Sequence, residues 1–241
     1  MSKVVATTVL PEDSGEVLTL GDTGDAIAIS GDSLNLNNLQ DAGGNNIITS
    51  DGAGNLTVNS AFGGAMNLLT TNTFTDAASS SFTSLIDSTY NVYIFTFIDI
   101  NPATDDADFS FQANAAGASG YNETITSTWF RAYHNEDDGA SGVAYHTGSD
   151  QAQGTAFQKI TNSGNGADES IAGELHLFNP ASTTYVKNFY FRSNSYNASN
   201  VSIDAFGAGY FNTTTAIDDI QFKMSSGNMD GIIKMYGISK S

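Results

Sequence analysis

The chain of 241 residues has no cysteine, only 3 prolines and only 8 lysines and arginines. The lack of cysteine excludes disulfides and thiolate chemistry, and it leaves the redox compartment undetermined. With 26 acidic residues, the scarcity of bases gives a formal net charge of −18. This charge repels phosphate, so we expect neither nucleic-acid binding nor attachment to an anionic membrane surface. Two explanations of the acidity stay open: solubility, and the binding of cations or of a basic partner.

Long apolar runs are also missing. The longest, Val92–Ile98, is interrupted by Thr96 and has the length of a strand, whereas a transmembrane helix needs about 18 apolar residues or more. The first residues contain no apolar segment of signal-peptide length. We therefore expect no membrane insertion. We also expect synthesis in a cytoplasm, so that an outer surface would be reached by assembly or lysis.

The polar residues that are present favour strands and turns. Gly is abundant, at 24 residues, and Ser, Thr, Asn and Asp outnumber Glu, Lys and Arg, which commonly cover helix surfaces. No segment shows a capped helical periodicity of 3.6 residues, and a short turn around residues 76–84 is the one helical feature we expect. The composition therefore predicts an all-β protein.

The N-terminal quarter divides into two segments. Residues 1–15 hold a β-branched run, Val4–Leu10, that ends at Pro11, and we interpret them as an anchoring arm. Residues 16–65 contain short apolar pairs, such as Leu18/Leu20 and Leu56/Val58, with Gly- and Asp-rich turns between them. Strands this short do not make a stable sheet within one chain, so we predict a β stem in which three chains wrap together. A flexible linker is the alternative interpretation.

The remainder, residues 66–241, has the pattern of a β-sandwich. Nine runs are rich in β-branched and aromatic residues or alternate with a period of two: Phe82–Ile86, Tyr90–Ile98, Asp108–Gln112, Glu123–Tyr133, Gly173–Phe178, Tyr185–Arg192, Val201–Phe206, Ile217–Met224 and Gly231–Ile238. We predict a jelly-roll head. The glycine-rich spans 135–154 and 162–170 are predicted to be loops.

Few residues suggest chemistry. The histidines His134, His146 and His176 match no metal motif. The acidic runs at 105–108 and 136–138 do not have the spacing of a calcium-binding loop, so we expect solvated charges, with calcium as the alternative. Nucleophile-elbow and phosphate-loop patterns are absent. We predict no catalytic residue, no metal ligand and no enzyme activity.

Aromatic residues are the better candidates for ligand contact. An exposed ring beside Asn or Asp suits a sugar, whereas most rings in strands fill a core. Among Trp129, Tyr133, Tyr145, Tyr190, Tyr196 and Tyr210, we choose Tyr145, Tyr196 and Trp129 as ligand-binding residues, on the condition that their rings are exposed. Tyr145 and Tyr196 lie in or near expected loops, where binding residues concentrate.

Two parts of the sequence resemble bacteriophage proteins. Residues 45–58 resemble the stem repeats of tail and head fibres. Five further stretches are similar to a domain of virion proteins from marine bacteriophages and related viruses: Tyr90–Phe95, Phe130–Glu136, Gly173–Lys187, Gly209–Phe222 and Ser226–Ile238. The resemblance implies a homotrimeric β-sandwich on a stem, located on the virion, and it transfers no active site.

Two functions follow as expectations. The first is a fibre-like virion protein that is attached to capsid or tail through residues 1–15 and adheres to a host-surface glycan. The alternative is a capsid decoration or cement protein that stabilises the shell without binding a receptor. A third function, a polysaccharide-degrading tailspike, requires two carboxylates in a cleft, separated by about 5 to 10 Å.

Overall fold

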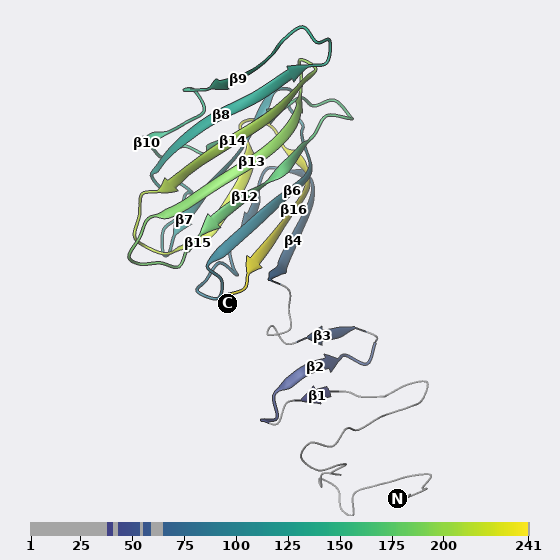
Figure 1. The fold of residues 1–241 in the computed structure, drawn as a ribbon, viewed down its shortest axis with the longest axis vertical. Helices are drawn as coiled ribbons and strands as arrows, with labels where there is room; N and C mark the ends of the chain where they lie inside the picture. Colours follow the sequence, from purple (N-terminus) through teal and green to yellow (C-terminus); the bar gives the residue numbers. More distant parts are fainter. Residues whose placement is uncertain (1–37, 41–42, 54, 59–64, 241) are drawn as a thin grey trace, which may run out of the picture. The chain divides into compact units, whose positions relative to one another are not determined.

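The computed structural model describes residues 38–40, 43–53, 55–58 and 65–240, and the chain divides into two units, Met1–Phe62 and Gly63–Ser241 (Figure 1). The expected arm, residues 1–15, lies outside the described residues, as does most of the first half of the expected stem. Within the described ranges every regular element is a strand, which confirms the all-β prediction. The helical turn expected around residues 76–84 is wrong, because Ser80–Phe82 forms a strand.

The first unit contains a small antiparallel sheet in the order β1 (Asn38–Gln40), β2 (Asn46–Ser50) and β3 (Leu56–Val58). The β2–β3 turn is held by Asp51, whose carboxylate accepts hydrogen bonds from the backbone N–H of Ala53 at 2.7 Å and the side-chain amide of Asn55 at 2.6 Å. These bonds, that of Asn55 foremost, lower the pKa of Asp51. A short strand is therefore present at the pair Leu56/Val58, whereas the pair Leu18/Leu20 lies outside the described residues; the sharing of strands among three chains stays a prediction.

The second unit is built from two antiparallel sheets. Its strands are β4 (Met66–Ala77), β5 (Ser80–Phe82), β6 (Val92–Pro102), β7 (Ala107–Ala115), β8 (Ile125–Asn135), β9 (Ser141–Tyr145), β10 (Ala152–Gly154), β11 (Gln158–Ser163), β12 (Ile171–Phe178), β13 (Lys187–Asn197), β14 (Val201–Phe211), β15 (Ile217–Met224) and β16 (Met229–Ile238). The nine-stranded sheet has the order β10-β8-β14-β13-β12-β6-β16-β4, with β9 paired to β8, and the four-stranded sheet has the order β11-β7-β15-β5. The described residues of this second unit thus form a β-sandwich.

Phenylalanine rings fill the space between the two sheets. Phe222 of β15 is fully buried and lies 5.5 Å from Phe95 and 5.4 Å from Phe97, both on β6 of the other sheet. Phe111 of β7 meets Phe189 of β13 edge to face at 5.1 Å. Because strand side chains alternate between faces, the central strands of the nine-stranded sheet direct one side into this core and leave the other side free, whereas the second side of β7 is buried too, at Ser110, Gln112 and Asn114.

The free side of the nine-stranded sheet is broad. Strands β8, β14, β13 and β12 lie toward the viewer in Figure 1, with β7 and β15 behind them. β14 pairs along its whole length with both β13 and β8. The lack of a side chain at Gly207 is required on β14, because a Cβ at this position would lie 2.0 Å from the ring of Phe191. This glycine lets the Phe191 ring pack directly on the β14 backbone.

Two parts of the sequence prediction need correction. The span 135–154 is not all loop, because it contains the edge strands β9 and β10. Strand β4 was not among the nine predicted runs, although it is the longest strand described. Both regions are rich in Ser, Thr, Asn or Gly, and as edge strands they bury few apolar side chains, so their periodicity is weak.

Candidate ligand-binding face

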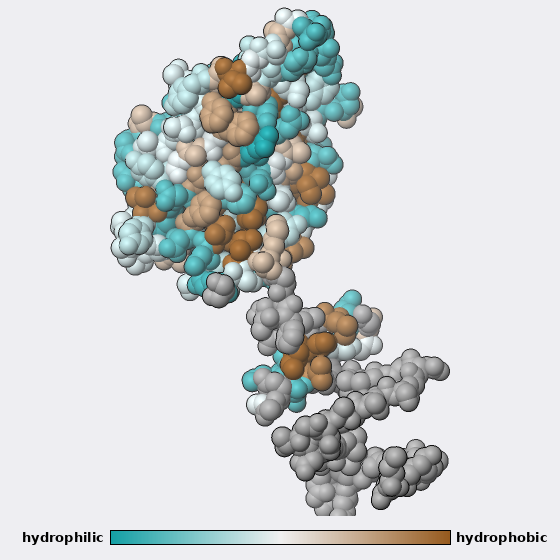
Figure 2. All heavy atoms as spheres, in the orientation of Figure 1, coloured by the Kyte–Doolittle hydropathy of each residue, from teal (hydrophilic) through white to brown (hydrophobic). Residues whose placement is uncertain are grey.

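We call the side of the nine-stranded sheet that turns away from the four-stranded sheet the outer face. On each of its central strands, buried residues alternate with residues that reach solvent. The outward residues are Thr126, Thr128 and Phe130 of β8, Ser202, Asp204, Phe206, Ala208 and Tyr210 of β14, Asn188, Tyr190, Arg192, Asn194 and Tyr196 of β13, and Ala172, Glu174, His176 and Phe178 of β12. Figure 2 shows hydrophobic side chains scattered among polar ones on this side.

One row of aromatic rings crosses β8 and β14. Phe130 and Phe206 are stacked, with ring centroids 4.9 Å apart and an interplanar angle of 2°. The guanidinium carbon of Arg192 lies 4.7 Å from the Phe206 ring centroid. Arg192 is itself fixed by Asp204, which accepts two hydrogen bonds from it at 3.1 and 2.7 Å. Arg192 thus covers one side of this aromatic row, and we call Phe130, Phe206 and Arg192 together the ridge.

A second aromatic group lies on β12 and β13. His176 stacks on Tyr190 with ring centroids 4.4 Å apart, and Phe178 lies 5.6 Å from the same tyrosine ring. Glu174 Oε1 is 3.1 Å from His176 Nε2, without the alignment of a hydrogen bond. Tyr190 nevertheless keeps 42% of its surface exposed, so one side of this group is open to a ligand.

Two hollows lie on either side of the ridge. The first, of about 490 Å³, is bordered by the rings of Phe178, Tyr190 and Tyr210 and has Ala208 and Gly209 among its lining residues. We call it the apolar hollow. The second, of about 700 Å³, is lined by polar residues that include Glu174, Arg192, Asn194 and Asp204. We call it the polar hollow. Small residues between larger ones create both depressions, since alanine and glycine leave the backbone uncovered.

The structure places the three residues chosen from the sequence in different environments. Tyr145 pairs in register with Phe130, is 52% exposed, and donates a hydrogen bond to Asp150 Oδ2 at 2.5 Å. That hydrogen bond raises the pKa of Tyr145. The aromatic row thus continues onto the edge strand β9, and Tyr145 joins the outer face.

Tyr196 also faces outward, at the far end of β13. Its hydroxyl donates to Asn200 Oδ1 at 3.0 Å, and Glu136 Oε2 lies 3.5 Å away. Desolvation, followed by the negative charge of Glu136, raises the pKa of Tyr196. Because this hydroxyl is engaged locally and the ring is half-buried, Tyr196 offers less to a ligand than Tyr145 does.

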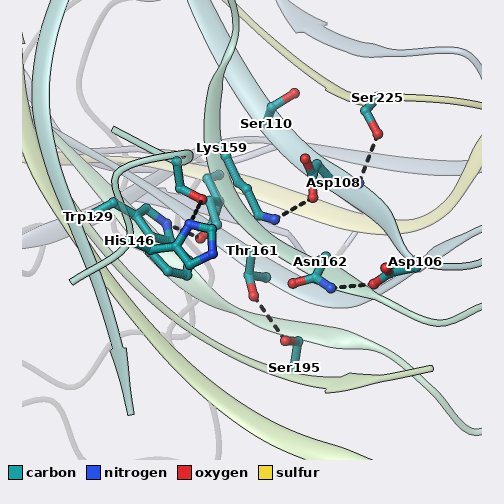
Figure 3. Close-up of polar contacts among 12 residues, drawn as sticks. Asp106, Asp108, Ser110, Trp129, His146, Lys159, Thr161, Asn162, Ser195 and Ser225 are labelled. Carbon is teal, nitrogen blue, oxygen red and sulfur yellow. Dashed lines mark hydrogen bonds and ion pairs between the residues drawn. The ribbon is translucent and has the colours of Figure 1, made fainter. Parts of the chain in front are cut away.

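Trp129 does not meet the condition that its ring be exposed. Only 1% of its surface is accessible, and its indole N–H donates to the carbonyl of Ile160 at 2.9 Å. Figure 3 shows the indole beside His146, with the ring centroids 5.5 Å apart. We therefore remove Trp129 from the candidate site. Tyr190 and Tyr210 belong there instead; the sequence places both among the aromatic candidates, but the outward direction of their rings comes from the sheet register.

The aspartates of the acidic run at 105–108 form an ion pair and hydrogen bonds with residues 159–165. Asp108 forms an ion pair with Lys159 at 2.5 Å, and Asp106 accepts a hydrogen bond from the amide of Asn162 (Figure 3). Asp105 accepts one from the backbone N–H of Asn165 at 3.3 Å. Across the described ranges, no three His, Asp or Glu residues gather as metal ligands would.

Comparisons with known proteins add no relative. No known protein family matches the chain, and no curated protein matches it either. Among the residues described, no helix is long and apolar enough to cross a membrane.

Proposed function

We propose that the protein is a non-enzymatic virion component, fibre-like, that adheres to a host-surface glycan through the outer face of its β-sandwich. Residues 1–15 attach it to capsid or tail, the stem is shared by three chains, and the head is a variant of the jelly roll. The observation that carries the adhesive function is the outer face itself, where Tyr145, Phe130 and Tyr190 keep 52%, 40% and 42% of their surfaces exposed. Phe130 pairs in register with Tyr145 and stacks on Phe206, and contiguous apolar surface on a folded domain commonly marks an interaction site.

Sugars suit this surface better than most ligands do. A pyranose ring presents C–H groups on its faces and hydroxyl groups around its rim, so it matches rings that stand beside amide and hydroxyl side chains. The apolar hollow supplies both kinds of group, with Tyr190 beside Asn188, whereas the polar hollow supplies hydrogen-bonding groups such as Arg192 and Asn194. The virion assignment is supported by the resemblance of residues 45–58 and of the later stretches to phage proteins.

Binding without hydrolysis is supported by the state of the carboxylates. The polar hollow contains Glu174 and Asp204, the residue types that a glycosidase pairs. Asp204, however, is held by two hydrogen bonds from Arg192. Because both carboxylate oxygens of Asp204 are occupied by Arg192, Asp204 is not free to act with Glu174 on a glycosidic bond. We therefore expect the bound glycan to be released without cleavage.

The test uses the full-length chain and the phage particle that carries it. We expect a gold-labelled antibody to mark fibres that project from the particle, and the purified chain to bind a subset of glycans on an array without releasing reducing ends. Cross-linking is expected to trap a trimer. Even labelling of the shell, with no glycan bound, would instead identify a cement protein, and release of reducing ends would identify a depolymerase.

A further inference from the structure

The apolar hollow has the groups that recognise one sugar ring. Two of its rings, Tyr190 and Tyr210, stand to the sides of Ala208, whose short side chain leaves room over β14. The hydroxyls of these tyrosines and the amide of Asn188 form no hydrogen bond with the described residues. The site therefore offers apolar walls together with unused donors and acceptors, which is the combination that binding pockets use to orient a ligand.

The charge around the hollow selects against acidic sugars. None of the residues that line it is charged. Of the two cations on β13, Lys187 is fully buried and Arg192 is paired with Asp204, and the chain as a whole carries a net charge of −18. A carboxylated or sulfated sugar would meet a repulsive field and find no free cation there. An uncharged sugar incurs no such cost.

The two hollows lie along the same strands. Ala208 borders the apolar hollow and Asp204 the polar one, four residues apart on β14. At 3.2–3.4 Å per residue the two positions are about 13 Å apart, farther than a single sugar ring reaches. Between them lies the Phe206 ridge, with Arg192 above the ring.

We propose that the outer face binds a neutral oligosaccharide along β13 and β14, with one uncharged sugar ring in the apolar hollow and a later ring in the polar hollow. This inference deepens the proposed function and rests on it. Tyr190 and Tyr210 contact the C–H faces of the first ring, and Asn188 binds its hydroxyls. In the polar hollow, Glu174 and the side-chain oxygen of Asn194, whose amide nitrogen already donates to Ser202 and Ile203, accept hydrogen bonds from the hydroxyls of the ring that follows.

The experiment compares the full-length chain with two variants and a control. Tyr190→Ala removes a wall of the apolar hollow, and Ala208→Leu fills it from the exposed surface. Phe157→Ala removes a half-buried ring near Lys223, a residue of the four-stranded sheet, and so changes an aromatic side chain outside the outer face. Binding is first screened on an array of neutral glucans, galactans and mannans, and of glycans with uronic or sialic acids. Titration calorimetry then measures the affinity for each glycan that binds.

We expect binding to neutral glycans only, with affinity that grows from monosaccharide to oligosaccharide and changes little with salt. Each outer-face variant should weaken it about tenfold, and Phe157→Ala should leave it unchanged. Thermal melts confirm that each variant is folded.

Other outcomes separate the two proposals. Binding restricted to acidic glycans, or neutral binding that both outer-face variants leave intact, overturns this inference while adhesion to glycans stands. A chain that binds no glycan at all overturns the proposed function as well. If Ala208→Leu instead changes the oligomeric state, the outer face is an interface between copies of the chain, and this inference fails.

Discussion

Replacing Phe222 by alanine should show whether the two sheets are held together by one aromatic cluster. The Phe222 ring is fully buried and lies within 6.3 Å, between centroids, of Phe82, Phe95, Phe97, Phe109 and Phe111, which come from both sheets. Truncation of a core phenylalanine costs about 3–5 kcal/mol. Aromatic pairs add about 0.5–1.5 kcal/mol beyond area burial, so we expect Phe222→Ala to fall near the upper end.

The assay has a built-in reporter, because Trp129 is the single tryptophan and is buried in the same core. Its fluorescence in urea measures the free energy of unfolding of the sandwich. A loss of about 4 kcal/mol is a large share of the 5–15 kcal/mol of a typical domain and should lower Tm by about 10 °C. Phe222→Leu keeps most of the apolar volume and should cost about 1–2 kcal/mol.

The control is again Phe157→Ala, whose half-buried ring lies 6.5 Å from that of Tyr121. We expect it to cost less than about 1 kcal/mol. If Phe222→Ala costs no more than this control, the sheets are not joined through the Phe222 cluster, and our account of the core is refuted. A change in the urea dependence without a change in midpoint would point to separate unfolding of the two sheets.

Three further predictions concern single residues. Lys187 is fully buried and donates only to the carbonyls of Tyr185 and Thr213, and burial lowers its pKa from 10.5. Between that lowered pKa and 10.5 the unfolded chain binds more protons, so urea melts should show the native chain gaining stability relative to Lys187→Met as pH rises toward about 10; a constant difference would contradict this. Gly207→Val should drive a side chain into Phe191 and yield insoluble or strongly destabilised protein, as judged by soluble expression and thermal melts, whereas Ala208→Val on the opposite face should not. Asp204→Asn breaks an exposed ion pair with Arg192 and should change stability by less than about 1 kcal/mol in the same urea melts.

The strands are easiest to predict where one face of the strand packs in the core and the other face meets solvent. Ile217–Met224 matches β15 at both ends, and from Ile220 to Met224 its buried residues alternate with half-exposed ones. The long edge strand β4 was missed for the opposite reason, since its Thr- and Asn-rich sequence, like that of many edge strands, places few large apolar side chains in the core. How the strands divide between the two sheets depends on pairing between distant segments, which local patterns do not contain.

The candidate site shows a sharper limit of sequence reasoning. Trp129 and Phe130 are neighbours, and a strand directs one of them inward and the other outward. The sequence marks both as aromatic strand residues, but which of the two faces inward is set by the register of β8 against β14. Trp129 therefore enters the core while Phe130 joins the outer face. The same alternation divides Phe189 and Phe191 from Tyr190 on β13.

The position of β16 has a consequence for biosynthesis. This strand, residues 229–238, lies between β4 and β6 and pairs with both. During translation, β4 and β6 leave the ribosome long before the strand that joins them is made, so each waits with an unpaired edge. The nine-stranded sheet is therefore completed only after β16 emerges, and until then the facing edges of β4 and β6 are open to wrong pairing.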